Sequence, residues 1–375
     1  MRRLVLWWFA SLSCVFGFVP GAAARTWVAA PDGNGGDGNL ETIVPQLAEG
    51  DTLRLLSGTH SWPAGQTVVS TSILGDPGAE VTAGYVLFRQ AARLSLSGIA
   101  FSLPAAGVDV FQVSDVHIAG CTFRGCALGL RVTLLEVCSI ESCQFIDNGG
   151  DDQTDTVGLV LGSGNTTVSG CLFRNNRSSA GAPGDATAGG GGALRVGIGA
   201  DVTIRGCVFD GNTALSGSAV HSKALRLIFE ENTVVGNVCE SGAVVVRSDG
   251  ESAVIRKNIF ANNQSFGLFV GSASSAIPRV YCNAFWQNQG FNDSESREGG
   301  QWRAPIASGY DGADDYHSIL IDPRLCEDDS LRVALDSPLA SLGPPCGPIG
   351  GALGIGCVLS PTRTMSWGQI RSAFR

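Results

Sequence analysis

The chain has 375 residues and a formal net charge of −9 at pH 7, which argues against general binding to nucleic acid or anionic lipid. Charged residues make up 16% of the chain, below the usual quarter, while 51 glycines supply material for many turns. The composition therefore favours a turn-rich fold whose partners are neither nucleic acids nor membranes.

The first 24 residues have the pattern of a secretory signal peptide. Arg2 and Arg3 give a basic start, residues 4–18 form an apolar run, and residues 22–24 are three alanines. We predict cleavage after Ala24 and hence a secreted, periplasmic or cell-surface protein. Elsewhere no apolar run approaches the ~20 residues of a membrane-spanning helix, so we expect no transmembrane segment in the mature chain.

Residues 25–50 are predicted to form an N-terminal cap. Residues 31–39 combine Pro, Gly, Asp and Asn, which are typical of turns, although Asp32, Asn34 and Asp37 are also calcium-ligand types. Apolar residues at helical spacing then predict a short helix near 42–49, where Pro45 is compatible only with the first turn. Such a helix would cover the end of a stacked core and block edge-to-edge growth.

Residues 51–290 contain a motif that recurs at a period in the twenties. It consists of an apolar residue, two variable residues, a Cys or Asn, one variable residue and an aromatic residue, with one degenerate first copy. The copies begin at Leu96, Ile118, Ile140, Val168, Ile204, Phe229, Ile255 and Val280. Steps between aromatic positions, with Val234 standing in once, are 22, 22, 28, 36, 25, 26 and 25 residues. Such a repeat is the signature of a solenoid, here of eight coils.

Each repeat is predicted to hold short strands. Val202 and Ile204 alternate with polar residues, and a period of two is that of a strand. Three residues after the aromatic position an asparagine recurs, and a glycine then opens a second strand, as in residues 192–196. We therefore predict an all-β fold, a right-handed parallel β-helix with a short N-terminal capping helix.

Two sets of motifs resemble known families. Phe-x-x-Asn pairs such as Phe209 and Asn212, with Gly-Gly-Ala-Leu at 191–194, resemble the repeats of polymorphic outer-membrane proteins. Residues 50–290 as a whole resemble the right-handed β-helix repeat superfamily that includes pectate lyases and polygalacturonases. The cap resembles that of many secreted β-helices, pectin methylesterases included. The resemblance implies the fold but hardly any activity, because this scaffold carries unrelated functions.

One predicted inward column is shared by cysteines and asparagines. Its members are Cys121, Cys143, Cys171, Cys207, Asn232, Asn258 and Asn283, with Cys138 also inward. Small thiols pack as hydrophobic groups, and stacked amides bond to neighbours above and below. We predict a ladder of buried thiols continued by an asparagine ladder, and no metal site. Cys346 and Cys357 are the pair that we expect to form a disulfide.

Two adjacent coils carry long insertions, at residues 149–156 and 177–191. Long loops on a rigid scaffold commonly hold binding sites. Their candidate calcium ligands are Asp151, Asp152, Asp155 and Asp185. We predict no cofactor, with calcium at these loops as the alternative.

A basic outward column follows the second strands beside these insertions. The candidate substrate-binding residues are Arg131, Arg195, His221, Lys223 and Arg247. In an acidic protein such a column suits an anionic or hydroxyl-rich polysaccharide. The alternative is plain solvated charge, because the other outward column, from Glu141 to Tyr281, alternates in sign as cross-coil ion pairs do.

Residues 291–358 begin with a polar excursion. Residues 319–326 and 330–338 then resemble the closing coils of secreted bacterial β-helices. Residues 359–375 form a basic tail without an acidic residue, for which a sorting or anchoring role competes with a frayed end.

The predicted function is glycan binding, surface attachment or structure, without catalysis. The alternative is a polysaccharide-active enzyme, a uronate lyase or glycoside hydrolase, with His221 or Lys223 as the base. His221 lacks the flanking glycines of the polygalacturonase Gly-His-Gly signature, so that family's role does not carry over to it. A third alternative is an autotransporter-like passenger domain.

Overall fold

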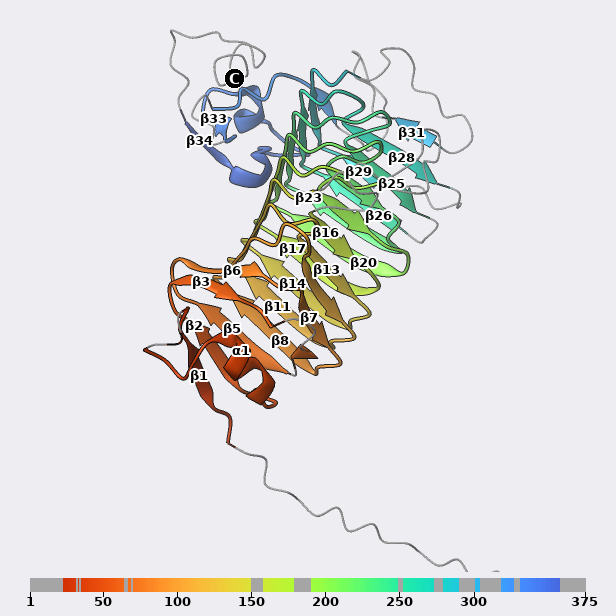
Figure 1. Ribbon diagram of the computed structural model, residues 1–375. Coiled ribbons are helices and arrows are strands. Elements are labelled where there is room, and N and C mark those ends of the chain that lie inside the picture. Colours follow the sequence, from red (N-terminus) through yellow and green to blue (C-terminus); the bar gives the residue numbers. More distant parts are fainter. Residues whose placement is uncertain are drawn as a thin grey trace, which may run out of the picture.

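The computed structural model is a rod of stacked coils with a small lobe on one side (Figure 1). It describes residues 23–31, 33, 35–63, 67–68, 70–149, 158–178, 190–248, 252–272, 279–289, 301–303, 318–326 and 331–357. Three long sheets run along the rod, and successive coils add parallel strands to each of them. The prediction of an all-β, right-handed parallel β-helix with one short N-terminal helix is therefore confirmed.

The three sheets are here called A, B and C, in the order in which one coil visits them. Among the described residues, sheet A consists of β1 (Thr26–Ala29), β2 (Thr52–Leu55), β5 (Thr71–Gly75), β8 (Arg93–Ser97), β11 (Asp115–Ala119), β14 (Val137–Glu141), β17 (Gly164–Ser169), β20 (Ala200–Arg205), β23 (Arg226–Glu230), β26 (Ser252–Arg256) and β29 (Arg279–Tyr281). Sheet B consists of β3 (Gly58–Ser61), β6 (Ala79–Ala83), β9 (Ala100–Phe101), β12 (Thr122–Arg124), β15 (Gln144–Ile146), β18 (Leu172–Arg174), β21 (Val208–Asp210), β24 (Thr233–Val235), β27 (Ile259–Ala261), β30 (Ala284–Trp286) and β32 (Ile319–Leu320). Sheet C consists of β4 (Thr67–Val68), β7 (Val86–Arg89), β10 (Val108–Phe111), β13 (Leu130–Thr133), β16 (Leu159–Leu161), β19 (Leu194–Val196), β22 (Val220–Ser222), β25 (Val244–Ser248), β28 (Leu268–Ser272) and the antiparallel β31 (Gln301–Arg303).

The stack extends beyond the eight predicted coils. β1, inside the segment predicted as a cap, already pairs with β2 in sheet A. At the other end, β32 pairs with β30 and closes sheet B. The repeat motif did not reveal β1, because this strand has the alternation of a strand but neither the ladder residue nor the aromatic partner.

The capping helix begins earlier than predicted. α1 spans Leu40–Ile43 and continues as a 3₁₀ turn, η1, over Val44–Gln46, instead of occupying residues 42–49. Asn39 fixes the start, because its side chain accepts a hydrogen bond from the Thr42 backbone N–H. Pro45 falls in the 3₁₀ turn, where its missing N–H costs nothing.

Each corner between sheets A and B uses one residue in the left-handed conformation. Gly120 (φ 60°) precedes Cys121 at one such corner, and Lys257 (φ 56°) precedes Asn258 at another. This sharp turn aims the next side chain into the core, where Cys121 and Asn258 are fully buried. The corner geometry therefore sets the inward column that the sequence predicts.

The asparagine part of that column is a continuous hydrogen-bonded ladder. Asn258 Oδ1 accepts from the backbone N (2.9 Å) and Nδ2 (3.0 Å) of Asn232. Its own Nδ2 donates to Phe229 O (2.9 Å) and to Asn283 Oδ1 (2.9 Å). All these groups are buried, so the amides need hydrogen-bond partners within the protein, and the ladder supplies them.

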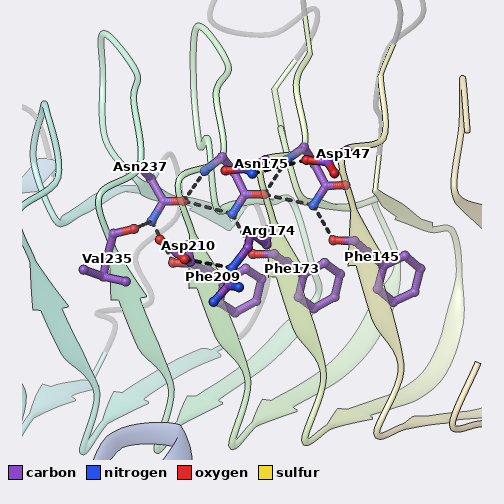
Figure 2. A network of polar contacts seen from close by, with 11 residues as sticks. Phe145, Asp147, Phe173, Arg174, Asn175, Phe209, Asp210, Val235 and Asn237 are labelled. Atoms are coloured by element: carbon purple, nitrogen blue, oxygen red, sulfur yellow. Dashed lines mark hydrogen bonds and ion pairs between the residues drawn. The ribbon is translucent and has the colours of Figure 1, made fainter. Parts of the chain in front are cut away.

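A second asparagine ladder lies at the corner between sheets B and C. The recurring asparagine after the aromatic position forms it, through Asn148, Asn176, Asn212, Asn237, Asn263 and Asn288. Figure 2 shows part of this ladder beside the stacked rings of Phe145, Phe173 and Phe209, whose ring centroids lie 4.7–4.8 Å apart. Where Val234 interrupts the aromatic stack, Phe229 from sheet A lies between Phe209 and Phe260.

The predicted thiol column is buried and free of disulfides. Cys121, Cys143, Cys171 and Cys207 are at most 2% exposed, and Cys138 is buried beside them. Each thiol of the column donates to a nearby backbone carbonyl, as Cys143 does to Glu141 O (3.3 Å). Burial raises the pKa of Cys138 to about 12, so this side chain stays a neutral thiol in the core.

The C-terminal lobe corrects two predictions. Residues 330–338 do not stack as a closing coil, because β33 (Val333–Ala334) pairs with β34 (Ile355–Cys357) beside the rod (Figure 1). The 3₁₀ turns η2 (Pro338–Ser341) and η3 (Gly351–Leu353) complete the lobe.

The predicted disulfide is wrong as well. Cys346 is bonded to Cys282, and Cys357 is bonded to Cys326. Cys282 occupies the left-handed corner before Asn283, and the lobe folds back against this last part of the rod. Proximity along the sequence therefore did not indicate which cysteines meet in space.

Candidate functional site

The outer face of sheet C holds the predicted basic column. The strand register aligns Arg131 of β13, Val160 of β16, Arg195 of β19 and His221 of β22. Val245 and Phe269 continue the column on β25 and β28. Adjacent strands in a sheet lie roughly 4.8 Å apart, so Arg131 and Arg195 are separated by roughly 10 Å along the rod.

His221 differs from its predicted exposure. Its side chain points away from the core but is only 1% exposed. A Cβ built on Gly190 would lie 2.0 Å from His221 Nδ1, and one on Gly217 would lie 2.8 Å from its Cβ. Backbone therefore lies directly against this residue, and His221 is not a surface base.

The covering layer is built from the connections between sheets B and C. Gly191 N donates to Ser216 O (2.9 Å), and Gly217 N donates to Gly242 O (2.9 Å). Thr213 forms bridges with Arg177 and Val238 in the neighbouring coils. The connections thus stack in register like a further short ladder, and Val245 beneath them is fully buried.

Lys223 and Arg247 lie past the ends of this covered stretch. Lys223 follows β22, its backbone N donates to Val196 O (3.0 Å), and it is partly exposed. Arg247 lies in β25, in register with Gly271 of β28, but its side chain is outside the described residues. The basic residues of the column therefore do not form one continuous open surface.

The open part of sheet C lies in the earlier coils and includes residues that the sequence prediction missed. Asp109 of β10 is in register with Arg131, whose guanidinium Nη1 lies 3.7 Å from Asp109 Oδ2. The Tyr85 hydroxyl donates to the same oxygen at 2.7 Å. The Arg131 side chain remains 44% exposed, so a large part of this cation faces solvent.

Aromatic groups flank this charged cluster. Tyr85 is 39% exposed, and the Arg89 guanidinium lies over the Phe111 ring at 5.5 Å from its centroid. Burial and the hydrogen bond to Asp109 raise the pKa of Tyr85 to about 12. The phenol is therefore protonated at neutral pH, and it offers a ring edge and a hydroxyl rather than a base or nucleophile.

One signal in the sequence could have located these residues. Residues 108–111 precede residues 130–133 by one 22-residue step, so Asp109 is the counterpart of Arg131. The predicted basic column begins at Arg131, because the coil before it carries only the degenerate copy of the motif. Extending the same register by one coil leads directly to Asp109.

The two insertions begin in neighbouring coils, as Arg177 N donates to Asn148 O (2.9 Å). Their central parts, with the candidate calcium ligands Asp151, Asp152, Asp155 and Asp185, are outside the described residues. Among the residues that the structure does describe, no group of three or more His, Cys, Asp or Glu side chains could hold a metal ion.

Several arginines on the outer face of sheet A lie closer to carboxylates of neighbouring coils than Arg131 does to Asp109 on sheet C. Arg93 Nε is 3.0 Å from Asp115, Arg226 Nη2 is 2.8 Å from Asp201 and Arg256 Nη2 is 2.6 Å from Glu230. Exposed pairs of this kind contribute under about 1 kcal/mol each. Sheet A therefore matches the interpretation as plain cross-coil ion pairs.

Comparison with known proteins supports the class of fold. Residues 185–298 match the family model described as right handed beta helix region. The chain is a right-handed parallel β-helix, an architecture that fits the pectate lyase-like superfamily. No curated protein matches the sequence. In the described part of the chain, no helix is long and apolar enough to cross a membrane.

Proposed function

We propose that this protein is an exported β-helix that binds an acidic polysaccharide on the open part of sheet C, without cleaving it. The surface in question, here called the basic face, consists of Tyr85, Arg89, Phe111 and Arg131, with Arg195 at its edge, where Arg195 is partly exposed beside the Gly191 backbone. The export step rests on the signal-peptide pattern of residues 1–24.

One observation carries the proposal. Arg131 and Arg195 stand in the same outward column on strands β13 and β19, with the apolar Val160 between them. Their separation of roughly 10 Å is comparable with that of carboxylates two sugars apart along an extended polyuronate. Guanidinium groups bind carboxylates through charge-assisted hydrogen bonds, and aromatic side chains next to them offer contact to sugar rings.

Two features favour binding over catalysis. The candidate base His221 is covered by backbone, and Tyr85 keeps its proton at neutral pH. Lys223 follows β22, three strands along sheet C from Arg131 of β13, so it does not complete a compact acid–base pair with that residue.

A polysaccharide panel tests the function. The chain from residue 25 onward would be incubated with polygalacturonate, alginate, hyaluronan and neutral dextran, while binding and the ultraviolet absorbance of unsaturated uronates are followed. We expect binding to acidic polymers, none to dextran and no rise in absorbance. Failure to bind any of the acidic polymers would overturn the proposal. A rise in absorbance would instead identify a lyase.

A further inference from the structure

The N-terminal end of the fold contains a buried carboxylate, that of Asp51. Asp51, at the start of β2, is 4% exposed. Its Oδ1 accepts from the Arg25 backbone N (2.8 Å), and its Oδ2 accepts from Trp27 Nε1 (2.9 Å) and from Ala48 N (2.9 Å). One side chain thus joins the start of β1 to the connection that follows the capping helix.

Arg25 is anchored by further contacts. Thr52 N donates to Arg25 O (2.8 Å), which bonds Arg25 to sheet A. Its guanidinium lies 3.5 Å from the Trp27 ring centroid and 3.2 Å from Asp37 Oδ1. Ala23 and Ala24, directly before it, are exposed to solvent.

The contacts and the sequence therefore point to the same peptide bond. Residues 22–24 are the small residues that a signal peptidase requires, and Arg25 directly after them is hydrogen-bonded to Thr52 and Asp51. We propose that hydrolysis of the Ala24–Arg25 bond creates an α-ammonium group at Arg25 that pairs with Asp51 and so locks the N-terminal cap.

The chemistry of the step is simple. Water adds across the peptide bond, so that Ala24 gains a carboxylate and the nitrogen of Arg25 becomes a free amine. An α-amino group has a pKa of about 7.7–8.0 and is largely protonated at neutral pH. The nitrogen that already lies 2.8 Å from Asp51 Oδ1 thereby changes from a neutral amide into a cation.

This change strengthens an existing contact without moving atoms. Before cleavage, the neutral Arg25 N–H already donates to a charged carboxylate; cleavage puts a positive charge on the donor and so adds the attraction between opposite charges. Burial raises the pKa of Asp51, but its hydrogen bonds from Ala48, Arg25 and Trp27 bring the pKa below its usual value, so the carboxylate is charged. The ion pair between the Arg25 ammonium and Asp51 stabilises the end of the core, where Trp27, Leu40 and Ile43 are buried.

The test compares two N termini in the same domain. One chain would begin at Arg25, released from an N-terminal fusion, and the other at Ala23, so that its ammonium lies two residues from Asp51. We expect the chain that begins at Arg25 to melt about 2–4 °C higher. Asp51→Asn should remove the difference. Asp37→Asn should preserve it, because Asp37 contacts the Arg25 guanidinium (3.2 Å) and accepts from Val28 N (2.8 Å) but does not contact the Arg25 backbone nitrogen.

A second measurement locates the cleavage. Mass spectrometry of the full chain, exported from a bacterial host, should find Arg25 as the first residue. Equal melting temperatures for the two N termini would overturn the lock, and this comparison does not depend on whether Asp51→Asn folds. Another first residue, or an uncleaved exported chain, would overturn the processing site. Neither outcome bears on glycan binding, which concerns sheet C.

Discussion

At the scale of single residues, the ladder positions carry the interior of this protein. Asn258 uses its amide for four hydrogen bonds to neighbouring coils, and Cys207 fills the same column where its backbone N donates to Asn232. The recurrence of Cys and Asn at one repeat position predicts correctly that such residues face inward, and the left-handed residue before each of them sets this direction. The sequence pattern does not predict exposure on the other side: His221 faces outward and is still covered by a glycine-rich connection.

The ladder gives the first prediction. Asn258→Ala should lower the free energy of unfolding by about 2–3 kcal/mol, because buried groups of Asn232 and Asn283 lose their partners. Asn165→Ala is the matched control, since Asn165 is an exposed asparagine in the strand β17 and should cost less than about 0.5 kcal/mol. Urea unfolding measures both. Similar losses would show that the ladder does not carry the stability assigned to it.

At the scale of elements, the C-terminal lobe is the feature that the repeat pattern did not reveal. Val235, Ile259 and Ala284 point outward from sheet B, yet they form a second apolar core with Val333 and Leu339 of the lobe. Apolar residues at outward strand positions were the available signal, because a solvated sheet face is normally polar. They indicate that something covers the face, but only the folded chain identifies the lobe.

The second prediction tests the docking of this lobe. Ile259→Ala should cost about 2–4 kcal/mol, because the side chain is fully buried between sheet B and the lobe. Ile228→Ala, at a 39% exposed outward position on β23, should cost less than about 0.5 kcal/mol. Thermal unfolding with the disulfides intact compares the two variants. If Ile259→Ala were as mild as Ile228→Ala, the lobe would not be packed against the rod.

At the scale of the whole molecule, the coils make a rigid rod with cross-coil ion pairs of different length on its two outer faces. On sheet A, Arg93 and Arg226 lie 3.0 and 2.8 Å from carboxylates one coil away. On the open part of sheet C, Arg131 lies 3.7 Å from Asp109, and the same carboxylate oxygen also accepts from the Tyr85 hydroxyl. The sequence predicted the fold and the basic column, because both follow from the repeat register. It could not predict how the connections divide that column, because their path over sheet C depends on contacts between coils.

The measurement that tests the central claim most directly compares three proteins binding to polygalacturonate by calorimetry, at low and at high salt. They are the parent, the double variant Arg131→Ala/Arg195→Ala on sheet C, and the double variant Arg93→Ala/Arg205→Ala on sheet A. Both variants change the net charge equally, so only the location of the lost cations differs. The account predicts that the sheet C variant binds about tenfold or more weakly, that the sheet A variant matches the parent, and that salt weakens the parent's binding. Equal affinity of the sheet C variant and the parent would contradict it.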